Sequence, residues 1–345
     1  MSVSPEPARR VLVIVSDRIG DVIFCTPALR LLREAEPGAR IEVMAQSEAA
    51  AQVLRGNPCI DRVFLCDEVQ AVAATTRFDR LIDLKANKVA RHTAELLGVA
   101  AERIRRGGPE HEAEIALACV ERATGAERGA AQRPYELYPG ASDHARVAAL
   151  LGEAGVQDAD VLIGLHMGCN RVARRGWKLW KPLTHPKAWP VERFHALAAE
   201  LCVAVPRLRL VLTGSSGELV LARRLLDRAP GTVNLIGKTS VTELAALMRR
   251  LRLFVTADTG PLHVACAADV PIVALFGATP VSSYGPWPPR EDRVVLEGSP
   301  VSAIAVAAVR DAVLAQLRAG RRHAVAASQA FAQRSNASAH TVHGA

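Results

Sequence analysis

The stretch LFVTADTGPLHVACAADVPIVALF, residues 253–276, decides the fold class. Residues 253–256 and 272–276 are short apolar runs, and residues 262–268 between them form a helical segment. Short buried strands that alternate with helices are typical of a parallel sheet covered by helices on both faces. We therefore predict that this stretch is one strand–helix–strand unit of a parallel sheet.

The same alternation extends from this stretch toward both ends of the chain. It predicts strands at residues 11–15, 41–44, 62–65, 81–83, 161–165, 208–212 and 233–236, and helices at residues 27–35, 48–55, 145–154, 191–204, 218–229, 242–251 and 304–317. A chain of 345 residues is about twice the usual domain length. We predict an α/β protein with two Rossmann-like domains, each built on a doubly wound parallel sheet.

A pause in the alternation marks the boundary between the two domains. Pro134, Pro139 and Gly140 interrupt the pattern before the helix and strand that open the second half. The last residues are rich in Ala, Ser and His and have no periodic apolar face, so we expect a disordered tail. The N-terminal domain, the C-terminal domain and the tail are predicted at residues 1–157, 158–320 and 321–345.

The charge of the chain is unevenly distributed. The net charge is +8, of which residues 1–160 carry −4 and residues 161–345 carry +12. This asymmetry predicts that the C-terminal half binds an anion. Aromatic residues make up only 4% of the chain, which leaves few platforms for stacking bases, so no nucleic-acid partner is expected.

Cysteine spacing and apolar runs indicate the compartment. The seven cysteines form no CxxC pair, so a disulfide framework is not expected. Residues 11–15 are too short for the apolar region of a signal peptide, and residues 262–281 are interrupted by His263, Asp269 and prolines. We expect a soluble cytoplasmic protein.

The loop at residues 258–263, DTGPLH, is the strongest candidate for a phosphate site. In doubly wound sheets, ligands bind beyond the carboxyl ends of the strands. Gly260, followed by Pro261 at the first helical position, leaves free backbone N–H groups at a helix N-terminus, and such groups attract phosphate. His263 either bonds the ligand or is a buried structural histidine.

The loop after the first predicted strand, SDRIGD at residues 16–21, offers a carboxylate. Gly20 permits a tight turn, and Asp21 follows near the N-terminus of the next helix. Asp21 either faces the ligand or caps the helix, and the motif alone leaves both roles open.

The long loop at residues 166–190 is basic. It holds Trp177, Trp180 and Trp189 but no acidic residue. Tryptophans are costly to leave in a solvated loop, so an anion-binding or interfacial role is favoured over a merely solvated face. Its basic residues are Arg171, Arg174, Arg175, Lys178, Lys181 and Lys187.

Other motifs carry little chemistry. Residues 214–217, GSSG, lack the spacing of a dinucleotide fingerprint and the lysine of a P-loop. Asp158 and Asp160 come before a predicted strand, whereas ligand-binding residues in this kind of sheet follow a strand. The histidines belong to no HExxH motif and have no cysteine partners with which to share a metal ion. We predict no obligatory cofactor and no dedicated metal site, and no motif supports assistance by Mg²⁺.

Taken in chain order, several motifs resemble glycosyltransferase family 9, the heptosyltransferases of the lipopolysaccharide inner core. The matching segments span most of the chain: RIGD at 18–21, TPAL at 26–29, NPCID at 57–61, KAWP at 187–190 with Arg193 and Phe194, DTGPLH at 258–263, and LFG at 275–277. The resemblance implies the GT-B architecture, in which two Rossmann-like domains face each other across a cleft. The N-terminal domain would hold the acceptor and the C-terminal domain the nucleotide sugar.

The resemblance also implies an activity, namely inverting transfer of a heptose from ADP-heptose to a lipopolysaccharide core or a related acceptor. Asp21 would be the general base, and Lys187 would stabilise the leaving diphosphate. Donor contacts are carried over onto Met167, Gly168, Lys187, Glu218, Asp258, Thr259, Gly260, Pro261 and His263.

The implied partners are a nucleotide sugar and an anionic glycolipid, with peripheral contact to the cytoplasmic face of the inner membrane. Candidate residues for the anionic acceptor are Arg18, Arg171, Arg174, Arg175, Lys178 and Lys181. Alternatives are another nucleotide sugar, a protein or small-molecule acceptor, a GT-B sugar-nucleotide epimerase, or a non-catalytic adaptor. The basic loop before Lys187 departs from the family pattern, and Lys178 and Lys181 compete for the role of Lys187.

Overall fold

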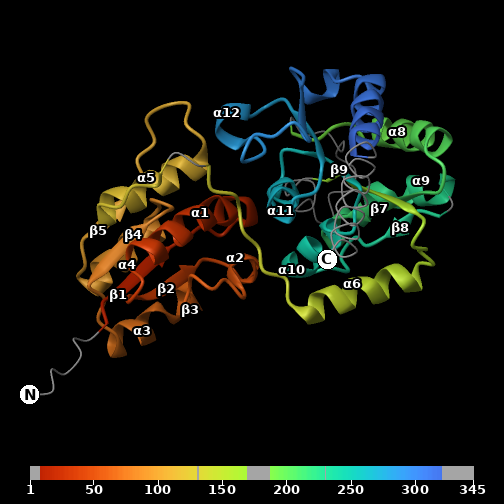
Figure 1. Cartoon of the computed structure of the whole chain (residues 1–345). Coiled ribbons are helices and arrows are strands. Elements are labelled where there is room, and N and C mark those ends of the chain that lie inside the picture. Colours follow the sequence, from red (N-terminus) through yellow and green to blue (C-terminus); the bar gives the residue numbers. More distant parts are fainter. Residues whose placement is uncertain (1–7, 130–131, 169–186, 230, 321–345) are drawn as a thin grey trace, which may run out of the picture.

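Two parallel sheets form the framework of the chain in the computed structural model (Figure 1). The structure describes residues 8–129, 132–168, 187–229 and 231–320. The first sheet belongs to the N-terminal half and the second to the C-terminal half, as the alternation of the sequence predicts. The predicted tail at 321–345 lies outside the described residues.

The first sheet has the strand order β3-β2-β1-β4-β5. Its strands are β1 (Arg10–Ile14), β2 (Arg40–Ala45), β3 (Arg62–Leu65), β4 (Arg80–Asp83) and β5 (Ala101–Arg103). The helices are α1 (Ile19–Ala35), α2 (Glu48–Leu54), α3 (Val69–Thr75), α4 (Lys88–Leu97) and α5 (Glu112–Thr124), with the short 3-10 helix η1 (Cys66–Glu68) before α3. Because the strand order reverses between β1 and β4, the loops after these two strands flank the expected ligand position.

Alternation along β1 explains why this sheet is covered on both faces. Val11 and Val13 pack with α1 and α5, whereas Leu12 and Ile14 pack with α3 and α4. All four side chains are at most 1% exposed. A strand that is buried on both faces reads as a continuous apolar run, which is the pattern of residues 11–15.

The second sheet has the strand order β11-β10-β9-β6-β7-β8. Its strands are β6 (Val161–His166), β7 (Leu208–Thr213), β8 (Val233–Asn234), β9 (Leu253–Ala257), β10 (Ile272–Phe276) and β11 (Arg293–Glu297). The helices are α6 (Ala141–Glu153), α8 (Val191–Ala204), α9 (Leu219–Arg228), α10 (Val241–Met248), α11 (Gly260–Ala268) and α12 (Val281–Tyr284), with η2 (Ser216–Glu218), η3 (Val301–Ala303) and a last helix at 306–320. Here the order reverses between β6 and β9, so the loops after these strands flank the second expected ligand position.

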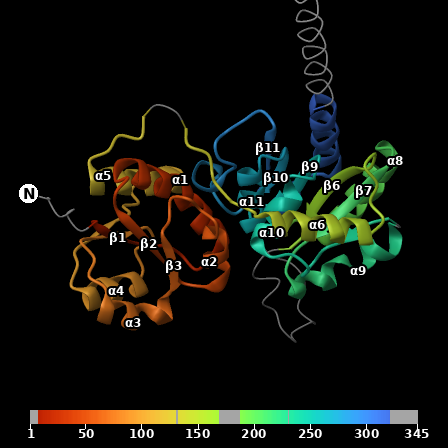
Figure 2. The same cartoon turned by 60° about the horizontal axis from the view of Figure 1, so that its bottom comes forward.

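The helix α6 packs on the second sheet and not on the first. It lies beside α10 in two views of the molecule (Figures 1 and 2), and Asp143 accepts a hydrogen bond from Thr242 Oγ1 at 3.0 Å. The chain therefore passes from one domain to the other before Gly140. The division at 157/158 stays a prediction, and this packing favours an earlier crossing.

The first helix begins eight residues before the predicted start at Pro27. A proline inside a helix leaves one carbonyl without its usual donor, and for Pro27 this is the carbonyl of Ile23. Thr26 Oγ1 donates to that oxygen at 2.8 Å and replaces the missing bond. The helix therefore continues through Pro27, and Asp21 lies in its first turn.

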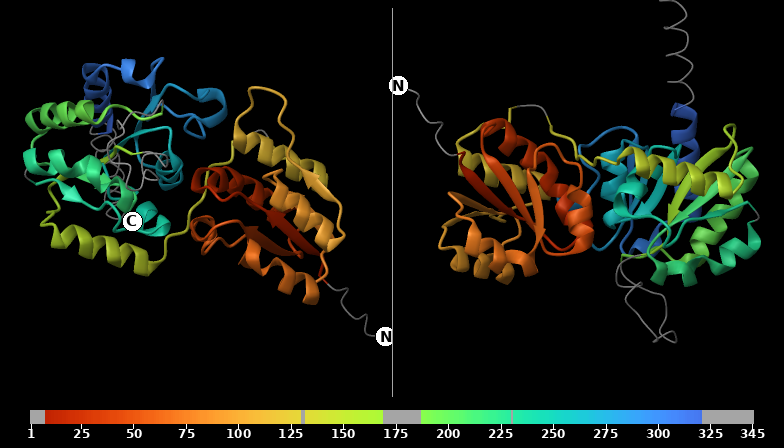
Figure 3. Two further views of the ribbon diagram at one scale, coloured as in Figure 1. Left: turned by 180° about the vertical axis from the view of Figure 1, so that it is seen from behind. Right: turned by 90° about the horizontal axis from the view of Figure 1, so that it is seen from below.

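The two domains meet at the N-terminal ends of α1 and α11. The views from behind and from below show the two domains side by side (Figure 3). A Cβ added to Gly260 would lie 3.5 Å from Ile19 Cβ and 3.8 Å from Gly20 N. A Cβ added to Gly20 would lie 3.7 Å from Gly260 Cα. These distances show that two glycines, one from each domain, allow the two backbones to approach closely.

Candidate active site

Asp21 is held at the carboxyl end of the first sheet by two side chains. Its Oδ2 accepts a hydrogen bond from Lys85 Nζ at 2.7 Å and another from Ser16 Oγ at 3.0 Å. Ser16 follows β1 and Lys85 follows β4, so the contacts come from both loops at the point where the strand order reverses. The Asp21 side chain keeps 32% of its surface exposed.

The alternative role of Asp21 as a helix cap is wrong. The N-cap of α1 is Arg18, and no side-chain hydrogen bond caps this helix. The carboxylate of Asp21 therefore remains available for chemistry, while its charge still lies favourably near the helix N-terminus. Arg18 itself is exposed at the edge of the site.

Lys187 and Asp258 form an ion pair in the candidate site on the second domain. Lys187 Nζ lies 2.6 Å from Asp258 Oδ2, which also accepts a hydrogen bond from Thr279 Oγ1. The ammonium group also lies 6.0 Å from the centre of the Tyr284 ring. Of the three competing lysines, Lys187 is thus placed beside the DTGPLH segment, whereas Lys178 and Lys181 lie outside the described residues.

The N-terminus of α11 lies at the contact with the first domain and has no side-chain cap among the described residues. The helix starts at Gly260 with Pro261 in its first turn, and the N-cap residue Thr259 makes no side-chain cap bond. Thr259 Oγ1 instead donates to Ala257 O at 3.3 Å. No cap therefore competes with an anion for the amide groups at this end of the helix.

His263 is buried beside the contact between the domains. It is 3% exposed, and its ring meets Phe24 edge-on with centroids 4.5 Å apart. Burial lowers the pKa of His263 from its ordinary value of 6.5 to about 4, so the ring is neutral at pH 7. Its Nδ1 has no hydrogen-bond partner among the residues that the structure describes.

Gly168 and Glu218 fit together at the carboxyl ends of β6 and β7. A Cβ on Gly168 would lie 1.8 Å from Glu218 Oε1, a distance that only glycine avoids. The Glu218 carboxylate is buried and accepts hydrogen bonds from Ser215 N–H at 2.7 Å and Ser215 Oγ at 3.0 Å. Met167, the preceding residue, is buried in the core of the same domain.

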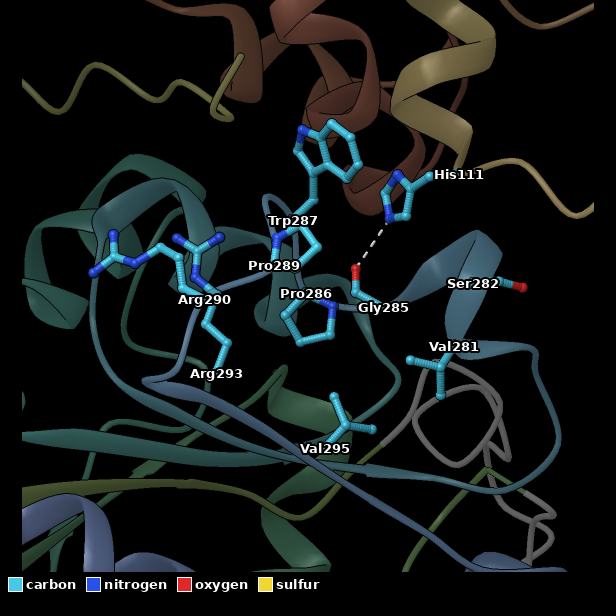
Figure 4. A pocket seen from close by; sticks show the side chains of 10 residues that line it. All are labelled: His111, Val281, Ser282, Gly285, Pro286, Trp287, Pro289, Arg290, Arg293 and Val295. Atoms are coloured by element: carbon cyan, nitrogen blue, oxygen red, sulfur yellow. Dashed lines mark hydrogen bonds between the residues drawn. The ribbon is translucent and has the colours of Figure 1, made fainter. Parts of the chain in front are cut away.

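A small cavity lies at the junction, between His111 and the segment that connects α12 to β11 (Figure 4). Its volume is about 290 Å³, and its lining includes Trp287, Arg290 and Arg293. Arg293 donates to backbone carbonyls and Arg290 pairs with Asp292, so these cations are already engaged. Both arginines of the described lining therefore already have partners within the protein.

His111 fastens the two domains together beside this cavity. Its Nδ1 accepts from Ala113 N–H at 3.2 Å and caps α5, so its Nε2 carries the proton and donates to Gly285 O at 3.1 Å. The ring also stacks on Trp287, with centroids 4.7 Å apart. Burial lowers the pKa of His111, which favours the neutral ring that these two bonds require.

The structure brings some of the predicted site residues into contact. The turn that carries Asp21 meets residues 258–263 through Gly20, Lys187 pairs with Asp258, and Gly168 meets Glu218. The predicted basic residues Arg171, Arg174, Arg175, Lys178 and Lys181 lie outside the described residues.

Sequence reasoning missed Ser16, Lys85 and Thr279. All three follow strands, and Lys85 is the second residue after the predicted strand at 81–83, so a search of every loop after a strand could have found it.

Within the described ranges, no group of three or more His, Cys, Asp and Glu residues is placed to hold a metal ion. No helix in the described part of the chain is both long enough and apolar enough to cross a membrane.

Parts of this chain are similar to known heptosyltransferases. The family model for glycosyltransferase family 9 (heptosyltransferase) matches residues 182–304. Lipopolysaccharide heptosyltransferase 3 of Escherichia coli is 29% identical over 103 residues, which cover 29% of this chain and 30% of that protein. Lipopolysaccharide heptosyltransferase 1 of Salmonella typhimurium is 24% identical over 80% of this chain and 92% of its own length.

Solved structures share the fold over nearly the whole chain. A family 9 glycosyl transferase from Veillonella parvula superposes with a TM-score of 0.77 at 22% identity, covering 90% of this chain and 97% of its own. The ADP-heptose lipopolysaccharide heptosyltransferase II of E. coli gives a TM-score of 0.73 at 18% identity, covering 90% and 99%. Two parallel-sheet domains that face each other in this way form the GT-B fold.

The sequence matches and the ordered motifs make this chain similar to glycosyltransferase family 9, and the match to the family model lies in the C-terminal half, at residues 182–304.

Proposed function

We propose that this protein is an inverting glycosyltransferase that moves a heptose from ADP-heptose to a lipopolysaccharide core or a related acceptor. The observation that carries the proposal is the contact between Gly20 and Gly260, which joins the first turn of α1, where Asp21 lies, to the start of the DTGPLH helix. This contact supports a site in which a carboxylate of one domain works opposite a phosphate site of the other. Inverting transfer needs these two groups on opposite sides of one anomeric carbon.

Asp21 would act as general base on the acceptor. A sugar hydroxyl is a poor nucleophile, so a positioned carboxylate removes its proton while the oxygen attacks the anomeric carbon. The bond between that carbon and the diphosphate oxygen breaks on the opposite face, and ADP departs. Lys85 and Ser16, which already bond Asp21, support this role because they hold the carboxylate in one orientation.

Lys187 and the N-terminus of α11 would stabilise the departing diphosphate. Negative charge grows on the leaving oxygens, and fixed cations and backbone amides favour that charge. Lys187 is paired with Asp258, the residue just before Thr259 and Gly260, and its side chain is partly buried, which supports this role. Glu218, Met167 and Gly168 would line the nucleoside part of the donor site, on the evidence of their common position beyond β6 and β7.

The acceptor in this proposal is an anionic glycolipid at the cytoplasmic face of the inner membrane. The charge of +12 in the C-terminal half and the basic loop before Lys187 support an anionic acceptor.

Reversing Arg171, Arg174 and Arg175 to Glu should weaken use of a phosphorylated acceptor and leave ADP binding intact. Screening over about 8 Å at physiological salt should also make acceptor use fall as salt rises.

A second candidate is a sugar-nucleotide epimerase, because the same fold occurs in that class. A putative UDP-N-acetylglucosamine 2-epimerase from Listeria monocytogenes superposes with a TM-score of 0.52 at 14% identity. An epimerase needs no acceptor, so incubation with donor alone separates the two functions.

The decisive experiment incubates the protein with a panel of ADP-, UDP- and CMP-sugars, with and without a heptose-deficient lipopolysaccharide acceptor. We expect release of ADP from ADP-heptose only when the acceptor is present. Conversion of a UDP-sugar without acceptor would favour the epimerase. Transfer from another nucleotide sugar would show that ADP-heptose is not the donor.

A further inference from the structure

The two donors that hold Asp21 bind the same carboxylate oxygen. Lys85 Nζ and Ser16 Oγ both donate to Oδ2, at 2.7 and 3.0 Å. Within the described part of the chain, no hydrogen bond to Asp21 Oδ1 is recorded. The carboxylate thus has one oxygen fixed by the protein and the other available.

The loop that presents Lys85 is shaped by a buried carboxylate. Asp83, at the end of β4, is fully buried, and its Oδ1 accepts from the N–H groups of Lys85 at 3.0 Å and Ala86 at 2.7 Å. Ala86 has φ = 56°, a left-handed conformation that is unfavourable for a residue with a Cβ. The loop holds this conformation because Asp83 binds both of its amide groups.

A second set of bonds fastens the same loop to the neighbouring strands. Asn87 Nδ2 donates to Gln46 Oε1 at 2.9 Å, and Gln46 Nε2 donates to Val15 O at 2.8 Å. Val15 directly follows β1, and Gln46 directly follows β2. The Lys85 loop is therefore fixed to the same strand end from which Ser16 and Asp21 extend.

The Lys85 ammonium is more than a surface ion pair. Its side chain is only 21% exposed, and a cationic donor 2.7 Å from a carboxylate forms a strong, charge-assisted hydrogen bond. The neutral hydroxyl of Ser16 has a competing acceptor in Asp17 Oδ1 at 3.2 Å, so Lys85 is the stronger constraint on the carboxylate.

We infer that Lys85 is a positioning residue for the base. It holds Asp21 Oδ2 so that Oδ1 faces the acceptor hydroxyl, an inference that rests on the proposed role of Asp21 as base. In the transfer step the hydroxyl proton moves to Oδ1, and the oxygen uses the freed electron pair to bond the anomeric carbon. The diphosphate leaves with the electrons of the broken bond, while Lys85 keeps its proton throughout.

The test compares Lys85→Met, Lys85→Arg and the matched control Lys88→Met, which removes an exposed lysine three residues further on. With saturating substrates, Lys85→Met should lower kcat about ten- to a hundredfold, the usual effect of a small misplacement of a reacting group. The KM for ADP-heptose and the rise in melting temperature with ADP should stay unchanged. Lys85→Arg should restore most of kcat, and Lys88→Met should leave kcat intact.

A double-mutant cycle tests whether Lys85 acts through Asp21. In the Asp21→Asn background, measured at raised enzyme concentration, Lys85→Met should cause no further loss. An equal loss in both backgrounds, or a normal kcat for Lys85→Met, would overturn the positioning role. If Asp21→Asn keeps normal turnover, the proposed base fails as well, so the two failures are distinguishable.

Discussion

The ring of His263 lies 3.0 Å, at Cδ2, from the position that a Cβ on Gly20 would occupy. The two residues belong to motifs more than two hundred positions apart, and each motif comes from a different domain. Glycine at position 20 therefore lets the helix that carries Asp21 rest against the helix that carries the candidate phosphate site. The site geometry depends on this contact as much as on the polar side chains.

Enlarging Gly20 should disturb the contact. We expect Gly20→Ala to destabilise the protein by about 1–3 kcal/mol, the usual cost of overpacking, because His263 is buried and cannot move freely. Turnover should fall together with stability, because a shift of the backbone at Gly20 also displaces Asp21, the next residue. The control is Gly38→Ala, where an added Cβ meets nothing within 4 Å. Thermal unfolding and turnover of both variants check this, and equal behaviour of the two would contradict it.

Neutralising Asp21 should separate chemistry from binding. Asp21→Asn keeps the size and shape of the side chain but removes its basicity, so turnover should fall about a hundredfold or more. ADP should still raise the melting temperature as in the unmodified protein, because the donor contacts lie on the other domain. Asp17→Asn, a nearby exposed carboxylate, is the control and should keep its activity. Near-normal turnover of Asp21→Asn with lowered stability would show a structural role.

Filling the space at Gly168 should displace Glu218. Gly168→Ala places a Cβ 1.8 Å from Glu218 Oε1, so the carboxylate must leave its bonds to Ser215. We expect a rise in the KM for the donor and a loss of stability of about 1–3 kcal/mol. Adding Glu218→Ala should recover stability but not donor binding. Recovery of both would show that Glu218 does not contact the nucleotide.

His263 should make stability depend on pH. Its pKa is about 4 when folded and near 6.5 when unfolded, because burial disfavours the charged ring. The unfolded chain therefore binds more protons between these values, and stability falls as pH drops from about 6.5 toward 4. The His263 contribution is roughly 3 kcal/mol at most. As pH drops from 7.5 to 4, the melting temperature should fall less steeply for His263→Gln than for the unmodified protein. Parallel curves for the two proteins would show that His263 is not the origin of the pH dependence.

Local patterns predicted the parts of the site that one segment builds alone. Gly260 and Pro261 mark an open helix N-terminus in any context, and alternating apolar runs mark both sheets. The start of α1 was missed because Pro27 normally ends a helix, and the compensating bond from Thr26 depends on a side-chain rotamer.

Through-space pairs could not be predicted in the same way. The bond between Lys85 and Asp21 exists because β4 pairs with β1 on the side away from β2, a strand order that the sequence does not state. Gly168 and Glu218 likewise meet only because β6 and β7 are neighbours. Lys178, Lys181 and Lys187 have the same chemistry at similar spacing, so the sequence does not choose among them, and only Lys187 lies in the described part of the chain.

The stacking of Trp287 on His111 gives the molecule a built-in optical signal. The indole N–H of Trp287 donates to Arg133 O at 2.8 Å, in the segment that leads from the first domain to the second. This chromophore of the second domain therefore contacts both that segment and His111 of the first domain. Trp189, by contrast, is buried within the second domain and bonded to Ile304 O. Any rotation of one domain against the other changes the surroundings of Trp287 and spares those of Trp189. With Trp177 and Trp180 replaced by Phe, fluorescence emission can therefore follow that rotation without an attached dye.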